Sequence, residues 1–375
     1  MLYFVGVIIA FFLALLLISK KDKSGADKIL ALWLLFIGIH LLAVYLLTST
    51  KYIQFPYLLG IELPMPLIHG PFLYLYCASL TQQHYKKGLR LLHFLPFVFG
   101  YIPFLGFLIS SFENKILVYQ NQGKGYTEVL SVMFLLFILS GVVYVFLSLQ
   151  LLAKHKKNIA NQFSYTEKIN LAWLRYLTLG IMLIWICIIF GTDEYTFTAV
   201  VLYILFIGFF GIKQVGIFTH KRPDTAHLQD IAIDTSLAIA SNNETEKYLK
   251  SGLGNVAANE IHAQLSEAML NHKWYKNPEL SLGKLSFDLD VPVNQLSQVI
   301  NTKEQKSFYD YINQLRIEEF KRIVAQPENQ KFTLLALAFD CGFNSKASFN
   351  RNFKKVTGLS PTEYLKSINI ALTEK

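Results

Sequence analysis

The chain has little charge and few cysteines. Only 16% of its 375 residues are charged, while 53% are hydrophobic. Soluble globular proteins carry about 25% charged residues, so this composition favours a membrane protein. The three cysteines (Cys77, Cys187 and Cys341) are far apart and form no C-x-x-C pair. This spacing indicates neither a disulfide framework nor a metal site, and we expect small, buried, apolar cysteines.

Motifs of catalysis are also missing from the hydrophobic half of the chain. It holds no H-E-x-x-H, no S-x-x-K, no nucleophile elbow and no Walker lysine. Such motifs bring a metal, a nucleophile or a phosphate-binding group to one place. The sequence therefore favours a protein that is not an enzyme and that needs neither cofactor nor metal.

The first half of the chain does contain long apolar runs. We expect a transmembrane domain over residues 1–215 with seven spans, each near the roughly 20 residues that cross a bilayer. The spans cover about 1–19, 29–48, 57–81, 91–111, 129–153, 171–190 and 195–212. The first run is read as a span and not as a cleaved signal peptide, because no basic residues precede it.

Basic residues alternate between the connections. Those after the first, third, fifth and seventh spans hold 14 Lys and Arg residues, and the other three hold only Lys51, Lys115 and Lys124. Because basic loops stay on the cytoplasmic side, we expect the N-terminus outside and the C-terminus in the cytoplasm.

Two ionisable residues of the third span, Glu62 and His69, are candidates for sensing a signal. They flank prolines in the run Glu62-x-Pro64-x-Pro66-x-x-His69. A broken helix exposes backbone groups that a protein-lined cavity can satisfy, and such sites are often functional. The alternative is a third span that starts near Met65, which leaves Glu62 in the outer loop of a simple membrane tether.

Beyond the spans the composition changes. Residues 216–259 are expected to form a cytoplasmic linker, and residues 260–370 a helical domain. Helical periodicity returns near residue 260, where Ile261, Leu265, Met269 and Leu270 form one apolar stripe.

A first helix-turn-helix unit is expected at about 281–303. Ser281 can cap its first helix, and Pro292 suits the start of its second helix. The outward face of that second helix carries short polar side chains of the kind that read base edges. These are Asn294, Ser297, Gln298 and Asn301.

A second helix-turn-helix is expected at about 333–356, with Thr333 as the cap of its first helix and Gly342 at a turn that needs positive φ. Leu335, Ala336 and Phe339 are expected to be buried in its first helix, as are Phe349, Phe353 and Val356 in its second. The outward arc of the second helix is basic, as contact with phosphates requires. It holds Lys346, Ala347, Asn350, Arg351 and Lys354.

A helix at 308–325 connects the two units. At 1.5 Å per residue its length is about 27 Å. Such a spacer suits recognition helices in successive major grooves, which lie about 34 Å apart on DNA. Two tandem units with polar or basic second helices favour DNA binding over a plain helical bundle.

The second helix-turn-helix contains the run Ala338-Phe339-Asp340-Cys341-Gly342-Phe343, followed by Ser348-Phe349-x-Arg351-x-Phe353 and Gly358-x-Ser360-Pro361. Through these motifs, residues from about 262 to 367 resemble the DNA-binding domain of AraC-type transcriptional regulators. The membrane half is similar to that of some bacterial AraC-type proteins, through Gly70-Pro71-x-x-Tyr74 and His93-x-x-Pro96.

This resemblance implies an all-α, membrane-bound regulator in the bacterial inner membrane, with its DNA-binding domain in the cytoplasm. Its implied partners are a double-stranded DNA operator, the lipid bilayer and an unknown small-molecule or membrane signal. RNA polymerase and a second copy of the chain are further candidate partners. The alternative function is a membrane transporter or channel with a regulatory helical tail. A transport pathway would require charged residues within the spans, but Glu62 is nearly the only one.

Overall fold

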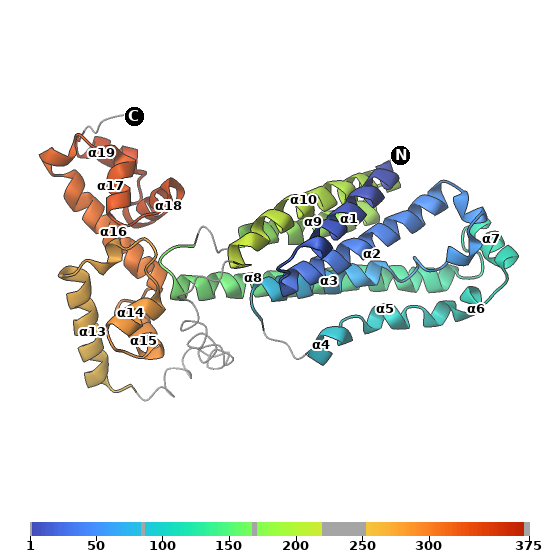
Figure 1. The fold of residues 1–375 in the computed structure, drawn as a ribbon, viewed down its shortest axis with the longest axis horizontal. Helices are drawn as coiled ribbons and strands as arrows, with labels where there is room; N and C mark the ends of the chain where they lie inside the picture. Colours follow the sequence, from blue (N-terminus) through green and yellow to red (C-terminus); the bar gives the residue numbers. More distant parts are fainter. Residues whose placement is uncertain (1, 84–86, 167–170, 220–252, 371–375) are drawn as a thin grey trace. The chain divides into compact units, whose positions relative to one another are not determined.

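The computed structural model describes residues 2–83, 87–166, 171–219 and 253–370 (Figure 1). The regular elements among these residues are helices. Phe163 and Ser281 form an isolated antiparallel β-bridge. The chain divides into two compact units: residues 1–155 with 171–221, and residues 156–170 with 222–375. The second unit therefore includes a short segment from within the hydrophobic half.

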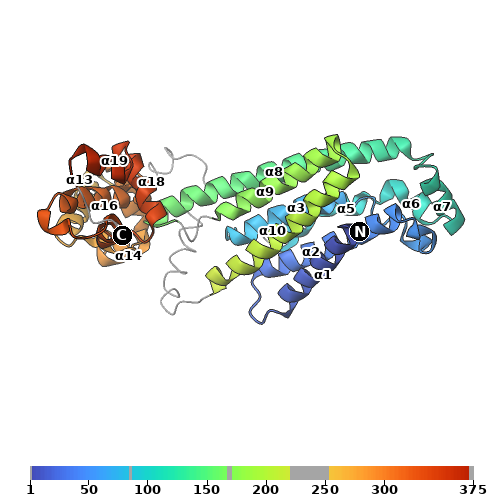
Figure 2. The same ribbon diagram turned by 90° about the horizontal axis from the view of Figure 1, so that it is seen from above.

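The first unit is a bundle of long apolar helices. They are α1 (Leu2–Ser19), α2 (Gly25–Thr48), α3 (Pro66–Leu80), α8 (Thr127–Gln162), α9 (Ala172–Phe190) and α10 (Asp193–Thr219). α1 packs along both α2 and α10, and α9 packs along α10 (Figure 2). Their core is formed by large buried side chains such as Trp33, Tyr76 and Leu174.

Among the residues that the structure describes, five segments, fewer than the seven expected, are long and apolar enough to cross a membrane. They are Gly25–Thr48, Gly88–Leu108, Thr127–Gln162, Ala172–Phe190 and Glu194–Gly211. The second consists of short helical pieces: α4 (Lys87–Leu92), α5 (Leu95–Phe99), η3 (Ile102–Phe104) and α6 (Leu105–Leu108). The first expected span corresponds to a shorter apolar helix, Tyr3–Ser19.

The expected third span, 57–81, is wrong in its first half. The chain before α3 forms two short 3-10 turns, η1 (Lys51–Ile53) and η2 (Pro56–Leu58), and α3 begins only at Pro66. Proline lacks the N–H that a helix interior needs, so it is tolerated in the first turn. α3 is thus 15 residues long, and Glu62 lies ahead of it.

Many apolar side chains of the first unit are exposed. On α8 this face includes Val132, Leu135, Leu139, Val142 and Phe146. Contiguous exposed apolar surface is rare on soluble proteins, and this surface is compatible with a membrane domain.

The second unit contains two small helical cores. The helices are α13 (Asn255–Leu270), α14 (Leu282–Asp288), α15 (Val293–Lys303), α16 (Phe308–Val324), α17 (Leu334–Asp340), α18 (Lys346–Thr357) and α19 (Pro361–Ser367). One core gathers α13, α14 and α15 around the first half of α16, including Ile312. The other gathers α17 and α18 around the second half, including Phe320. α16 therefore carries both cores.

Three expected core positions are exposed. Leu270 at the end of α13 is 72% exposed, Phe339 is 46% exposed, and Val356 is 37% exposed. α17 begins at Leu334 and buries Leu337 and Ala338, so the expected buried face is rotated. The expected linker 216–259 lies mostly outside the described residues. Its described ends are largely helical, because α10 continues to Thr219 and α13 begins at Asn255.

Candidate nucleic-acid interface

The first helix-turn-helix consists of α14 and α15. The Ser281 hydroxyl caps α14 by accepting a hydrogen bond from the backbone N–H of Lys284 at 3.2 Å, as expected. Asp290 supplies the positive φ of the turn, at +53°. The buried Ser286 hydroxyl donates to the carbonyl of Val291, which ties the turn to α14.

The exposed face of α15 is polar and lacks acids. Its buried face consists of Leu296, Val299 and Ile300. Asn294 is exposed on the other side, and the remaining expected base-reading side chains, Ser297, Gln298 and Asn301, are half-buried. All four lie on one helix with accessible surface, as groove contact requires.

The second helix-turn-helix consists of α17 and α18. Gly342 has a φ of +97°, and a Cβ at this position would lie 2.7 Å from the carbonyl oxygen of Lys276. Both the conformation and the close backbone therefore demand glycine. Burial raises the pKa of the neighbouring Cys341 thiol to about 12, so this cysteine is a packing residue.

α18 presents a basic face to solvent. Phe349 and Phe353 are fully buried on its inner side, with ring centroids 4.8 and 5.6 Å from that of Phe320 on α16. The outer side consists of exposed residues: Lys346, Ala347, Asn350, Arg351, Lys354 and Lys355. The Ser345 hydroxyl caps the helix by accepting from the N–H of Ser348.

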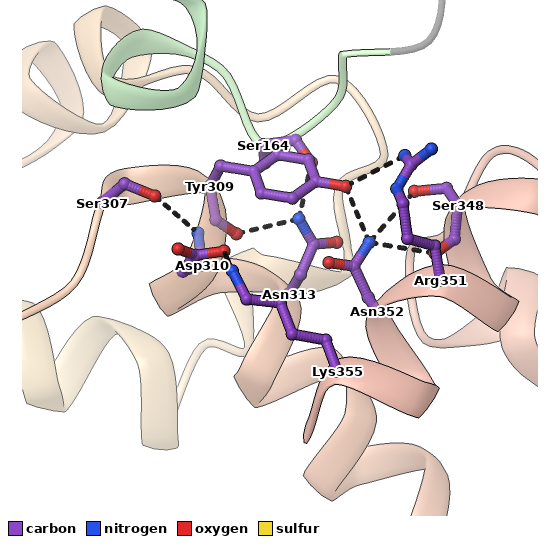
Figure 3. Close-up of polar contacts among 9 residues, drawn as sticks. All are labelled: Ser164, Ser307, Tyr309, Asp310, Asn313, Ser348, Arg351, Asn352 and Lys355. Atoms are coloured by element: carbon purple, nitrogen blue, oxygen red, sulfur yellow. Dashed lines mark hydrogen bonds and ion pairs between the residues drawn. The ribbon is translucent and has the colours of Figure 1, made fainter. Parts of the chain in front are cut away.

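A polar contact fixes α18 on α16 (Figure 3). The Asn352 side-chain amide donates to the Tyr309 hydroxyl at 2.7 Å, and the Arg351 guanidinium donates to the same hydroxyl at 3.3 Å. Lys355 pairs with Asp310 at 2.6 Å. These contacts fix the orientation of the basic helix on α16.

Sequence reasoning missed Tyr309 and Asn352 as supports of this face. Asn352 is buried and also donates to the carbonyl of Ser348, one turn earlier. Asn352 follows Ser348 by four residues, so both lie on the inner side of α18. This spacing could have predicted from the sequence that Asn352 faces inward.

A buried carboxylate joins two segments of the second unit. Glu319 of α16 pairs with Arg322 at 2.8 Å, Lys276 at 3.0 Å and Lys273 at 3.2 Å. The hydrogen bonds from Arg322, Lys276 and Lys273 hold the pKa of this carboxyl well below its usual range. The cluster joins η5 (Trp274–Lys276) to α16.

The structure separates the two candidate sensing residues of the first unit. Glu62 lines a small apolar cavity together with Leu42, Leu46, Tyr52, Phe55 and Leu58. The Glu62 carboxylate accepts hydrogen bonds from the Tyr119 hydroxyl and from the N–H of Gly60.

His69 does not line that cavity. Its Nδ1 accepts a hydrogen bond from the Trp33 indole at 3.3 Å, and its Nε2 lies 3.0 Å from Nδ1 of His40. Since Nδ1 accepts, the proton of a neutral His69 sits on Nε2 and points at His40. The pair is a half-buried contact between α2 and α3.

Comparison with known proteins adds one match. Residues 285–367 match the family model of a helix-turn-helix domain of AraC type. This range spans α15, α16, α17 and α18 and supports a DNA-binding regulator of that type. No curated protein and no solved structure matches the chain.

Proposed function

We propose that the protein is a membrane-bound one-component transcription regulator that reads a double-stranded DNA operator through α15 and α18. The observation that carries this proposal is that both helices present an exposed polar or basic face and are packed on the same helix, α16. A single spacer of 17 residues, about 26 Å long, suits two successive major grooves.

The proposed DNA contacts come from both helices. Asn294, Ser297, Gln298 and Asn301 supply them on α15, and Lys346, Ala347, Asn350, Arg351 and Lys354 on α18. Arginine suits bidentate contact with guanine, and asparagine or glutamine suits adenine. The four cations of α18 add phosphate contacts.

We place the protein in the bacterial inner membrane with the second unit in the cytoplasm, where DNA is accessible. The basic connections support this orientation. The cavity at Glu62 is the proposed signal site, and its apolar lining favours a small, largely apolar ligand with one polar group. His69 is proposed to stabilise the contact between α2 and α3.

DNA binding by the full-length protein in lipid nanodiscs tests the proposal. Affinity for a selected operator should fall by about 10²-fold between about 50 and 200 mM salt, because four phosphate contacts release counterions. A protein that retains no selected sequence after repeated rounds of selection would not be a sequence-specific regulator.

A reporter driven by the operator separates a sensor from a tether. Glu62→Gln should change the response to the inducing condition without changing protein level or operator affinity. A response that survives replacement of the whole first unit by an unrelated bundle of the same orientation would show that the membrane half is only an anchor.

A further inference from the structure

A short segment of the hydrophobic half belongs to the DNA-binding unit. Residues 156–166 comprise the end of α8 and the first residues of its connection to α9, and they group with the second unit. Phe163 pairs with Ser281 in an antiparallel bridge, and Ser281 is the residue that caps α14. The connection between two candidate membrane spans is thus joined directly to the start of the first helix-turn-helix.

Ser164 is the centre of this contact and is only 1% exposed. Its backbone N–H and its hydroxyl both donate to the carbonyl of Leu280, at 3.1 and 2.7 Å. Its own carbonyl accepts from the Asn313 amide at 3.0 Å, seen in Figure 3, and from the Arg316 guanidinium at 3.3 Å. Every polar group of Ser164 is therefore engaged.

Arg316 extends the contact to the rest of the unit. This buried guanidinium also donates to the Ser164 hydroxyl at 3.1 Å, to the carbonyl of Tyr275 at 2.7 Å and to that of Asn277 at 2.7 Å. It lies 5.8 Å from the ring centroid of Phe343, at the turn of the second helix-turn-helix. One buried cation thus touches the 156–166 loop, the chain just before α14 and the turn of the second helix-turn-helix.

We propose that the Leu280–Asn313–Arg316 surface is a docking site for the chain's own 156–166 segment, and that this docking couples α8 to the recognition helices. The docked loop supplies two of the hydrogen bonds to a buried guanidinium. A buried charge that loses partners is strongly destabilised, so undocking should loosen α16 against the first helix-turn-helix. The docking claim stands on geometry alone, and the coupling claim rests on the proposed function.

A disulfide in the full-length chain tests docking. Paired residues of an antiparallel bridge have Cα separations of about 4.5–5.5 Å, which a disulfide can span. We would combine Phe163→Cys with Ser281→Cys and insert a protease site within residues 220–252. After cleavage without reductant, the double variant should migrate as one species, and each single variant as two fragments. Two fragments from the double variant would overturn the proposal.

Ser164→Leu provides the perturbation, because a bulky apolar side chain cannot occupy this enclosed position. Added to the double-cysteine variant, it should lower the cross-linked fraction by about tenfold. Lys156→Ala, at an exposed position of the same segment, should leave that fraction unchanged. A Ser164→Leu protein with the parental cross-linked fraction would show that Ser164 does not hold the loop.

Operator affinity of the same variants in nanodiscs tests the coupling. Loss of docking should weaken binding by about tenfold, since two recognition helices on a loosened α16 bind less cooperatively. Undocked protein with parental affinity would refute the coupling while leaving docking in place. Parent protein that binds no operator would instead refute the proposed function, and the cross-link would still decide whether the loop docks.

Discussion

At the scale of single residues, Gly342 makes the strongest demand on the sequence. Gly342→Val should destabilise the second unit by more than about 3 kcal/mol, because left-handed strain is joined by a clash with the backbone of Lys276. Gly358 also has positive φ, but a Cβ there meets nothing within 4 Å. Gly358→Val should therefore cost only about 1–3 kcal/mol.

Both effects can be measured by heating the full-length protein in the presence of a protease. The readout is the temperature at which the second unit becomes susceptible to cleavage. Equal shifts in this temperature for Gly342→Val and Gly358→Val would mean that the clash with the backbone of Lys276 does not add to the destabilisation.

Arg351 and Lys355 occupy the same helix but should behave differently. Arg351→Ala should weaken operator binding by about 1–3 kcal/mol and relax specificity at one base pair. Lys355 is already paired with Asp310, so Lys355→Ala should weaken binding less, and evenly across sequences. Affinities measured on a panel of single-base operator variants would distinguish them. Unchanged selectivity in Arg351→Ala would remove this residue from base reading.

At the scale of elements, the Glu319 cluster predicts how pH affects the joint between η5 and α16. The folded-state pKa of Glu319 is depressed, so its stabilisation is present above the unfolded pKa of about 4.5 and is lost as pH falls below it. Glu319→Gln should lower the free energy of unfolding by about 1–3 kcal/mol near pH 7 and reduce its dependence on pH below about pH 5.

Urea unfolding of the second unit at several pH values measures this dependence. Glu318→Gln is the matched control, because Glu318 is half-exposed and pairs with Lys321 at the surface in an i,i+3 contact. If both variants show the same acid profile, Glu319 does not stabilise the joint.

The elements also show what local sequence patterns can predict. Periodicity and capping residues indicated α15, α16 and α18, and the caps Ser281 and Thr333 are confirmed. The phase of α17 was wrong, because six of its seven residues are apolar and its sequence therefore does not distinguish a buried face from an exposed one. Docking of Ser164 on Leu280 joins residues 116 apart in sequence, and no local periodicity reports such a pair.

At the scale of the whole molecule, the apolar helices and the basic connections predict a defined topology. Reporter fusions after residue 253 should report the cytoplasm, and fusions within α7 (Phe112–Gln120) should report the outside, because basic connections stay inside. A cytoplasmic signal from α7 would contradict the orientation with the N-terminus outside. Seven spans are not confirmed, because the first expected span is a shorter apolar helix and the third is helical only from Pro66 onward.

The most direct test of the central claim is a footprint of the full-length protein in nanodiscs on its selected operator. Reading by α15 and α18 predicts two protected stretches whose centres lie about one helical turn, ~10 base pairs, apart on one face of the DNA. Gln298→Ala should weaken protection in one stretch and Arg351→Ala in the other. A single protected stretch, or two that respond equally to both substitutions, would contradict the claim that each helix reads its own groove.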